Sequence, residues 1–152
     1  MDAGIAMAVL ASGMCEHVSI YATAGSDSSR IHRTQKINPY RGFALQKEIK
    51  IQAKLLGGGG IFTHQCLEYI KQDLKDTPVD RIMVFSDSQD CDYTNSIPNP
   101  FGKYNYIVDV SSHKNGINYR GLWTAEISGW SEHFLKYIAA SEGQAITEQE
   151  EN

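Results

Sequence analysis

An apolar run that ends in a polar loop restricts the fold more than any other feature of this sequence. Within the segment from Val79 to Asp90, the four apolar residues Ile82–Phe85 are followed directly by Ser86-Asp87-Ser88. Such a run predicts a strand covered on both faces in a parallel sheet, where alternation is lost. Ligands of parallel sheets bind outside the carboxyl ends of the strands, which makes Asp87 the first candidate for chemistry. A solvated turn between a strand and a helix is the alternative interpretation.

The remaining sequence alternates between helical and extended patterns. Ala3–Met14 is rich in helix-forming residues and apolar almost all round, which predicts a buried helix. His17–Thr23 alternates with a period of two, and Ile31–Ile37 suits an edge strand protected by charged side chains. Further helices are predicted over 42–56, after the glycines at 57–60 and from Ser131 onward, and further strands over Val79–Phe85, Asn105–Val110 and Gly121–Ile127. This order favours an α/β fold with a doubly wound, mostly parallel sheet.

Length and composition predict one domain over residues 1–143, followed by a disordered acidic tail over 144–152. The formal net charge is -4, and no cluster of Lys and Arg lies in one segment, which argues against a surface that tracks a phosphate backbone. Cys15, Cys66 and Cys91 are odd in number and far apart, which favours a reducing, cytoplasmic compartment over a disulfide framework or zinc site. The apolar Ala3–Met14 segment is too short to span a bilayer and lacks the basic leader and cleavage pattern of a secretory signal, so we expect neither.

The run of four glycines at 57–60 calls for an explanation, because ordering glycines costs conformational entropy. It is either a flexible linker or a backbone that approaches a ligand or helix closely. The helical pattern begins directly after it, so Thr63 is expected near a helix N-terminus, where it caps the helix, accepts a hydrogen bond or ligates a metal. A phosphate site at the same helix end is a weaker alternative, because no Gly-Lys-Ser/Thr sequence follows the glycines.

Three segments together resemble a known family. They are Gly58–Thr63, Val84–Asp87 and Trp123–Ile138, and in this order and spacing the chain resembles the von Willebrand factor A-like domain at the C-terminal end of Ro (TROVE) ribonucleoprotein proteins. The resemblance implies a Rossmann-like sheet with a metal-ion-dependent adhesion site at its carboxyl edge. By the same resemblance Asp87 and Thr63 would be metal ligands. The rim of that site would be formed by Ser86, Ser88, Gly59, Gly60 and His64.

Oxygen ligands of this kind suit Mg²⁺, which prefers octahedral coordination and keeps waters beside one or two carboxylates. An open position on the metal would accept a carboxylate from a protein or another acidic ligand. The resemblance therefore implies a non-enzymatic binding module with Mg²⁺ or another divalent cation as cofactor. In such families RNA binding belongs to a helical-repeat domain upstream, so RNA would be reached only through that domain.

The sequence departs from the family before the first helix. The Asp-x-Ser-x-Ser loop is missing there, and so is the strand that carries it, which in the family lies between the strands expected at His17–Thr23 and Asp80–Phe85. We therefore expect a fold that is incomplete at its N-terminus, either because the chain is a C-terminal fragment or because another chain supplies the strand. Unpaired backbone groups in a buried sheet are costly, so self-association through the sheet is expected, together with weak or absent metal binding.

Two other classes remain open. The first is a small Rossmann-like hydrolase or phosphatase that depends on a metal and uses Asp87. Asp90-Cys91-Asp92 has the Asp-x-Asp pattern of a phosphatase nucleophile loop, but its spacing from the strand does not fit, and a charged loop is the simpler interpretation. The second is a fragment without an independent function. The five histidines show no metal-ligand spacing.

Overall fold

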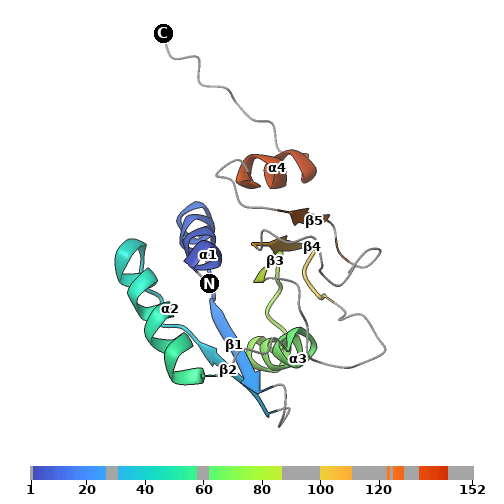
Figure 1. The fold of residues 1–152 in the computed structure, drawn as a ribbon. Coiled ribbons are helices and arrows are strands. Elements are labelled where there is room, and N and C mark those ends of the chain that lie inside the picture. The colour runs from blue at the N-terminus through green and yellow to red at the C-terminus, as the bar shows by residue number, and fades with distance from the viewer. Residues whose placement is uncertain are drawn as a thin grey trace.

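A computed structural model of the chain describes residues 2–26, 31–57, 62–86, 100–110, 123, 125–128 and 134–143. Four helices and five strands lie in this part of the chain, which confirms the expectation of a mixed α/β fold (Figure 1). Their bounds are α1 Asp2–Met14, β1 Tyr21–Ser26, β2 Ile31–Lys36, α2 Gly42–Leu56, α3 Thr63–Leu74, β3 Arg81–Ser86, β4 Tyr104–Asp109, β5 Ala125–Ser128 and α4 Phe134–Ser141.

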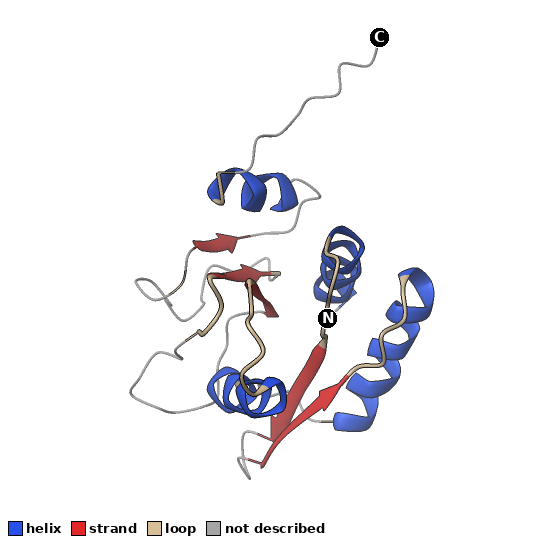
Figure 2. Cartoon of the chain, turned by 180° about the vertical axis from the view of Figure 1, so that it is seen from behind, coloured by secondary structure: helices blue, strands red, loops and turns tan. Residues whose placement is uncertain are grey.

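The strands form two separate sheets in the described residues. β1 and β2 make an antiparallel hairpin, whereas β3, β4 and β5 make a parallel sheet in that order (Figure 2). The expected edge strand at Ile31–Ile37 is confirmed as β2, and the strand predicted to start at His17 starts at Tyr21 instead. Residues 17–19 are exposed, and the first backbone bond of the hairpin runs from the Ile37 N–H to the Ile20 carbonyl.

β4 is buried more deeply than β3. Three successive residues of β4, Tyr106, Ile107 and Val108, are 0% exposed, whereas every residue of β3 is half-buried. The difference follows from position, because β4 has a paired strand on each side and β3 is paired on one side only. The prediction of a strand covered on both faces therefore describes β4 better than the run Ile82–Phe85 that prompted it.

α1 packs against both sheets on the same face of the fold. Met7 and Ala11 belong to a core cluster with Tyr106 and Val108 of β4 and Ile138 of α4. On its other side, α1 joins a second cluster, which contains Ile5, Ala8 and Val9 of α1, Leu45 and Ile49 of α2, Ile37, Ile20, and Ala22 of β1. The predicted helix is confirmed, but its burial is partial: the two packing surfaces account for most of its apolar residues, whereas Leu10 is 44% and Met14 72% exposed.

α3 covers the opposite face. Leu67 of α3 packs with Ile107 of β4 and Trp123, and Ile82 and Val84 of β3 lie against the same cluster. The alternate β3 residues, Met83 and Phe85, pack against the α1 cluster instead. Because successive side chains of a strand point to opposite faces, the fold has three layers, with α1, α2 and α4 on one face of the strands and α3 on the other (Figure 1).

Candidate functional site at the carboxyl edge of the sheet

The three parallel strands end in register. Ser86, the last residue of β3, pairs with Asp109 of β4, and Asp109 pairs with Ser128 of β5. The first turn of α1 lies beside this edge, because a Cβ atom placed on Gly4 would be 3.6 Å from Cβ of Phe85. An acidic residue between two serines thus marks the carboxyl end of the sheet, the position at which parallel sheets bind their ligands.

α3 begins at the same edge. Thr63 is its first residue and is 4% exposed, while Phe62 occupies the N-cap position without a side-chain capping bond. Thr63 is therefore not the N-cap residue that was one of its expected roles, and the N-cap position is held by a residue without a capping side chain. The short connection of residues 75–80 leads from α3 into β3, which packs against it, so helix and strand run in opposite directions. The start of α3 consequently lies toward the end of β3.

α3 is also fixed along the hairpin. At its start, the Phe62 ring lies 6.0 Å from the ring of His32, whose register partner on β1 is Gly25, near the end of that strand. At its last turn, Asp73 accepts hydrogen bonds from the Tyr21 hydroxyl at 2.6 Å and from Lys36 Nζ at 3.0 Å. α3 therefore runs opposite to β1 as well as to β3. It follows that β1 and β3 run in the same direction and end toward the same edge.

The polar contacts around Asp73 shift the ionisation of all three groups. Hydrogen bonds from Tyr21, and then from Lys36, hold the pKa of the Asp73 carboxyl below its usual value. Burial and the bond to Asp73 raise the pKa of the Tyr21 hydroxyl, and the same carboxylate raises the pKa of Lys36. All three groups are at least partly exposed, so the contact orients α3 rather than contributing much stability.

β1 and β3 face one another as the two inner edges of the separate sheets (Figures 1 and 2). On β1, Ile20 is hydrogen-bonded to Ile37 of the hairpin, so the N–H and C=O of Thr23 point away from β2. On β3, the carbonyls of Asp80 and Ser86 bond to β4, so the backbone groups of Met83 point away from β4. The hairpin and the parallel sheet thus present backbone hydrogen-bonding groups toward each other between the same two helices, α1 and α3.

The structure describes only part of the site expected from the sequence. Thr63 and His64 lie in the first turn of α3, buried and half-buried respectively, and Ser86 ends β3. These three residues belong to elements that meet at one edge. The other expected residues, Asp87, Ser88, Gly59 and Gly60, lie outside the described residues, as do Asp90-Cys91-Asp92 and the 144–152 tail. Within the described ranges, no group of three or more His, Cys, Asp or Glu residues is placed to hold a metal ion.

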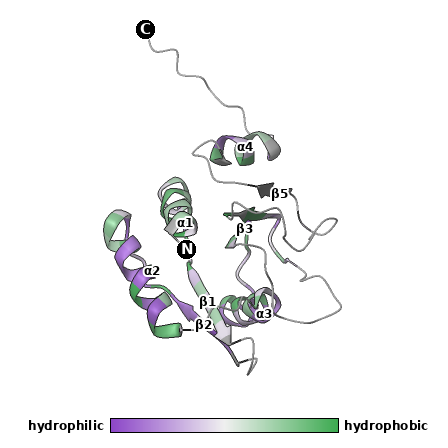
Figure 3. Ribbon diagram, viewed as in Figure 1, coloured by the Kyte–Doolittle hydropathy of each residue, from purple (hydrophilic) through white to green (hydrophobic). Residues whose placement is uncertain are grey.

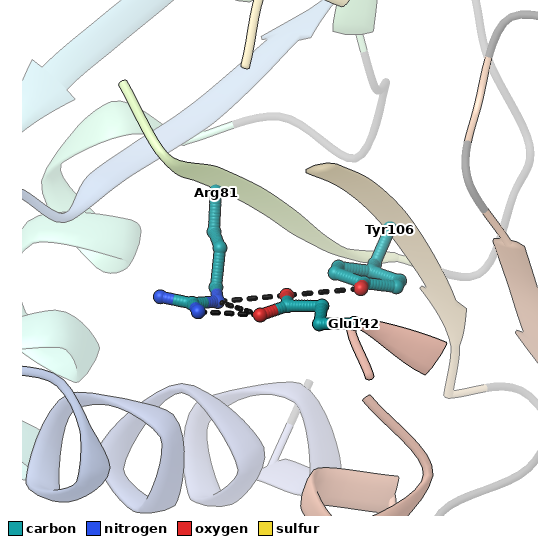
Figure 4. Close-up of polar contacts among 3 residues, drawn as sticks. All are labelled: Arg81, Tyr106 and Glu142. Atoms are coloured by element: carbon teal, nitrogen blue, oxygen red, sulfur yellow. Dashed lines mark hydrogen bonds and ion pairs between the residues drawn. The ribbon is translucent and has the colours of Figure 1, made fainter. Parts of the chain in front are cut away.

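A polar cluster that the sequence did not suggest lies toward the other end of β3. Glu142, just after α4, receives hydrogen bonds from Arg81 Nε at 2.7 and 2.9 Å and from the Tyr106 hydroxyl at 2.9 Å (Figure 4). A further contact joins Arg81 Nη2 to the same carboxylate. The Glu142 side chain is 2% exposed and that of Arg81 30%. The cluster ties the end of α4 to β3 and β4.

Burial and charge act in opposite directions on the cluster. Burial alone would raise the pKa of Glu142, but the hydrogen bonds from Arg81 and Tyr106 outweigh it and hold the pKa below its ordinary value. The carboxylate raises the pKa of Arg81. Burial, followed by the bond to Glu142, raises the pKa of Tyr106. The cluster is therefore an ionised pair with a neutral tyrosine across the neutral pH range.

No protein-family model, curated protein or solved structure matches the chain. None of the helices in the described part of the chain combines the length and apolar character needed to cross a bilayer. The geometry of the residues themselves is therefore the basis for a functional proposal.

Proposed function

We propose that the chain is a von Willebrand A-like binding module of the Ro (TROVE) type. Its fold would be Rossmann-like, with strand order β2-β1-x-β3-β4-β5, in which x is a central strand that the described residues do not contain. The observation that carries the proposal is the relation between β1 and β3. They run in the same direction, end toward the same edge and lie between α1 and α3, yet they belong to separate sheets.

The proposed binding site is the carboxyl edge. Asp87, which directly follows β3, and Thr63 at the start of α3 would supply oxygen ligands to Mg²⁺ or another divalent cation, with an acidic group of a protein partner as the last ligand. Two ligands bind such an ion weakly, because the missing loop would carry further oxygens. The free thiols of Cys15 and Cys66 are compatible with a cytoplasmic location, which forms part of this proposal.

Calorimetry with Mg²⁺ tests the metal site. We expect weak or undetectable heat for the chain alone, and any binding that does occur should be abolished by Asp87→Asn but retained in Asp80→Asn, an exposed aspartate at the other end of the same strand. Tight Mg²⁺ binding by the monomeric chain would contradict an incomplete site. Turnover of phosphate esters that depends on a metal and is lost in Asp87→Asn would instead favour the hydrolase alternative.

Self-association tests the proposal that the position between β1 and β3 is open to another strand. Thr23→Pro removes an N–H that points away from β2, so the hairpin keeps its backbone bonds, losing only the exposed bond from the Thr23 hydroxyl to the Arg33 carbonyl, while the inner edge of β1 loses a donor. We expect the chain to form dimers or larger species in sedimentation velocity, and Thr23→Pro to weaken this association at least about tenfold, since a lost bond and a steric clash act together. Ala24→Pro, which removes a bond within the hairpin, should unfold it. If the chain is monomeric and Thr23→Pro leaves its sedimentation unchanged, the proposal of an open edge on β1 is refuted.

A further inference from the structure

The outer face of α2 has a composition that the core does not explain. Leu45 and Ile49 pack inward against α1. Away from this side of the helix, Phe43 is 89% exposed and Ile51 44%, and Leu55, which is 69% exposed, lies on the flank next to them. A single exposed apolar residue is ordinary, but three on one helix face are not required by folding. Figure 3 shows hydrophobic and hydrophilic residues interleaved along this helix.

The hydrophilic residues of this face are all cations. Lys47 and Lys54 are exposed, and at about 100° per residue they fall on the same side as Phe43, with Ile51 and Leu55 beside them. Glu48 is the one acidic residue of α2, and it is half-buried and accepts hydrogen bonds from Asn38 at 2.9 Å and Gln52 at 3.0 Å. The exposed side chains of α2 therefore carry positive charge and apolar surface, while the one carboxylate of this helix lies at the border of the face and is bonded to Asn38 and Gln52.

We propose that this face, defined by Phe43, Lys47, Ile51, Lys54 and Leu55, binds an acidic, amphipathic segment of a partner polypeptide. Apolar side chains of the segment would cover Phe43, Ile51 and Leu55, while its carboxylates pair with the two lysines. The surface shares no residue with the proposed metal site, so the two sites bind independently.

Two other occupants fit the face less well. A symmetric contact between two copies of α2 would bring lysines of like charge together, which disfavours association. A helix that lies on a lipid surface needs a continuous apolar face turned toward the acyl chains. Here the continuous apolar face of α2 is already buried against α1, and on the outer face Lys47 and Lys54 lie between Phe43 and Leu55 along the helix. Interleaved charge and apolar surface match a peptide that carries both.

The test uses the full chain and a fluorescent model peptide about five helical turns long, with leucines on one side and glutamates on the other. We expect fluorescence anisotropy to detect binding that is weakened at least about tenfold when all glutamates of the peptide are glutamines. Phe43→Ser with Leu55→Ser, and separately Lys47→Glu with Lys54→Glu, should each weaken binding by a similar factor. These side chains are exposed, so the variants are expected to melt at the wild-type temperature.

The matched control places the same charge change elsewhere. Lys71→Glu with Lys75→Glu alters two exposed lysines at the end of α3 and should bind the peptide within about twofold of wild type, apart from long-range screening effects. Absence of peptide binding, or equal loss in this control, would overturn the proposal. A second result would also overturn it: the chain binds phosphatidylcholine vesicles with about one third phosphatidylserine, the α2 variants abolish that binding, and the peptide does not bind. That result assigns the face to a membrane surface.

Discussion

Neutralising Glu142 should destabilise the fold to an extent that depends on pH. Glu142→Gln keeps the shape of the side chain but removes its negative charge. In the wild type the carboxylate pairs with Arg81 and accepts a hydrogen bond from the Tyr106 hydroxyl. A hydrogen bond to a charged group contributes about 1.5–3 kcal/mol, and loss of one partner of a fully buried ion pair costs about 3–5 kcal/mol. Arg81 is 30% exposed and can be hydrated in the variant, so we expect a loss of about 2 kcal/mol. For a chain of this size that corresponds to a melting temperature lower by roughly 4–8 °C.

The sign of the pH dependence follows from the lowered pKa of Glu142. Its ionised form is favoured by folding, so its stabilisation is complete above the ordinary carboxyl pKa of 4.5 and is lost as pH falls through the lower pKa of the folded state. Thermal unfolding followed by circular dichroism at pH 7, 5 and 3 provides the measurement, because the first two values lie above the ordinary carboxyl pKa of 4.5 and the third lies below it. The difference in melting temperature between the wild type and Glu142→Gln should become smaller as the pH falls.

Two control variants make the result interpretable. Tyr106→Phe removes one hydrogen bond to the same carboxylate and should cost about 1 kcal/mol. Glu16→Gln removes a carboxylate whose side chain is 91% exposed, so the melting temperature should not change. A Glu142→Gln variant that melts with the wild type at pH 7, or a gap that is the same at pH 7 and pH 3, would refute the role assigned to the ion pair.

Two further changes test the packing. Leu45→Ala empties a position that is 0% exposed and should lower the free energy of unfolding by about 2–5 kcal/mol in urea titrations, with an unchanged slope if two-state unfolding holds. Gly102→Ala places a Cβ 2.8 Å from Oδ1 of Asn105. That side chain is held in place, because Oδ1 accepts from the Gly102 N–H and Nδ2 donates to the Gly102 carbonyl, so a loss of about 1–3 kcal/mol is expected in the same titration. Gly13→Ala is the matched control, because nothing lies within 4 Å of the added carbon and a helical alanine should stabilise by about 0.5–1 kcal/mol.

Local patterns predicted the elements better than their environment. The helix over 42–56 has the expected bounds, because Leu45 and Ile49 repeat at helical spacing and Gly57 ends the helix with a positive φ of 64°. The apolar run in β3 suggested a strand covered on both faces, yet the deeper burial is found in β4, whose sequence contains Asn105 and two tyrosines. Burial depends on which strands become neighbours, and a run of apolar residues does not specify that.

The candidate site shows the same limit. Ser86 and Thr63 could be placed at one edge from the sequence, because both stand at junctions between regular elements. The Arg81–Glu142–Tyr106 cluster had no local signal, since Glu142 is 61 positions from Arg81 and 36 from Tyr106. A glutamate after an amphipathic helix usually stays in water. Only the docking of α4 onto β3 and β4 turns it into a buried partner.

The two-sided packing of α1 has a consequence for how the molecule opens. The hairpin and the parallel sheet share no ladder in the described residues, so the clusters on either side of α1 communicate through that helix and α3. Cooperative units in native proteins often coincide with such supersecondary pieces. If α1 detached, β1, β2 and α2 would lose one core and the parallel sheet would lose part of another at the same time. We therefore expect detachment of α1 to speed amide exchange in the hairpin and in the parallel sheet together.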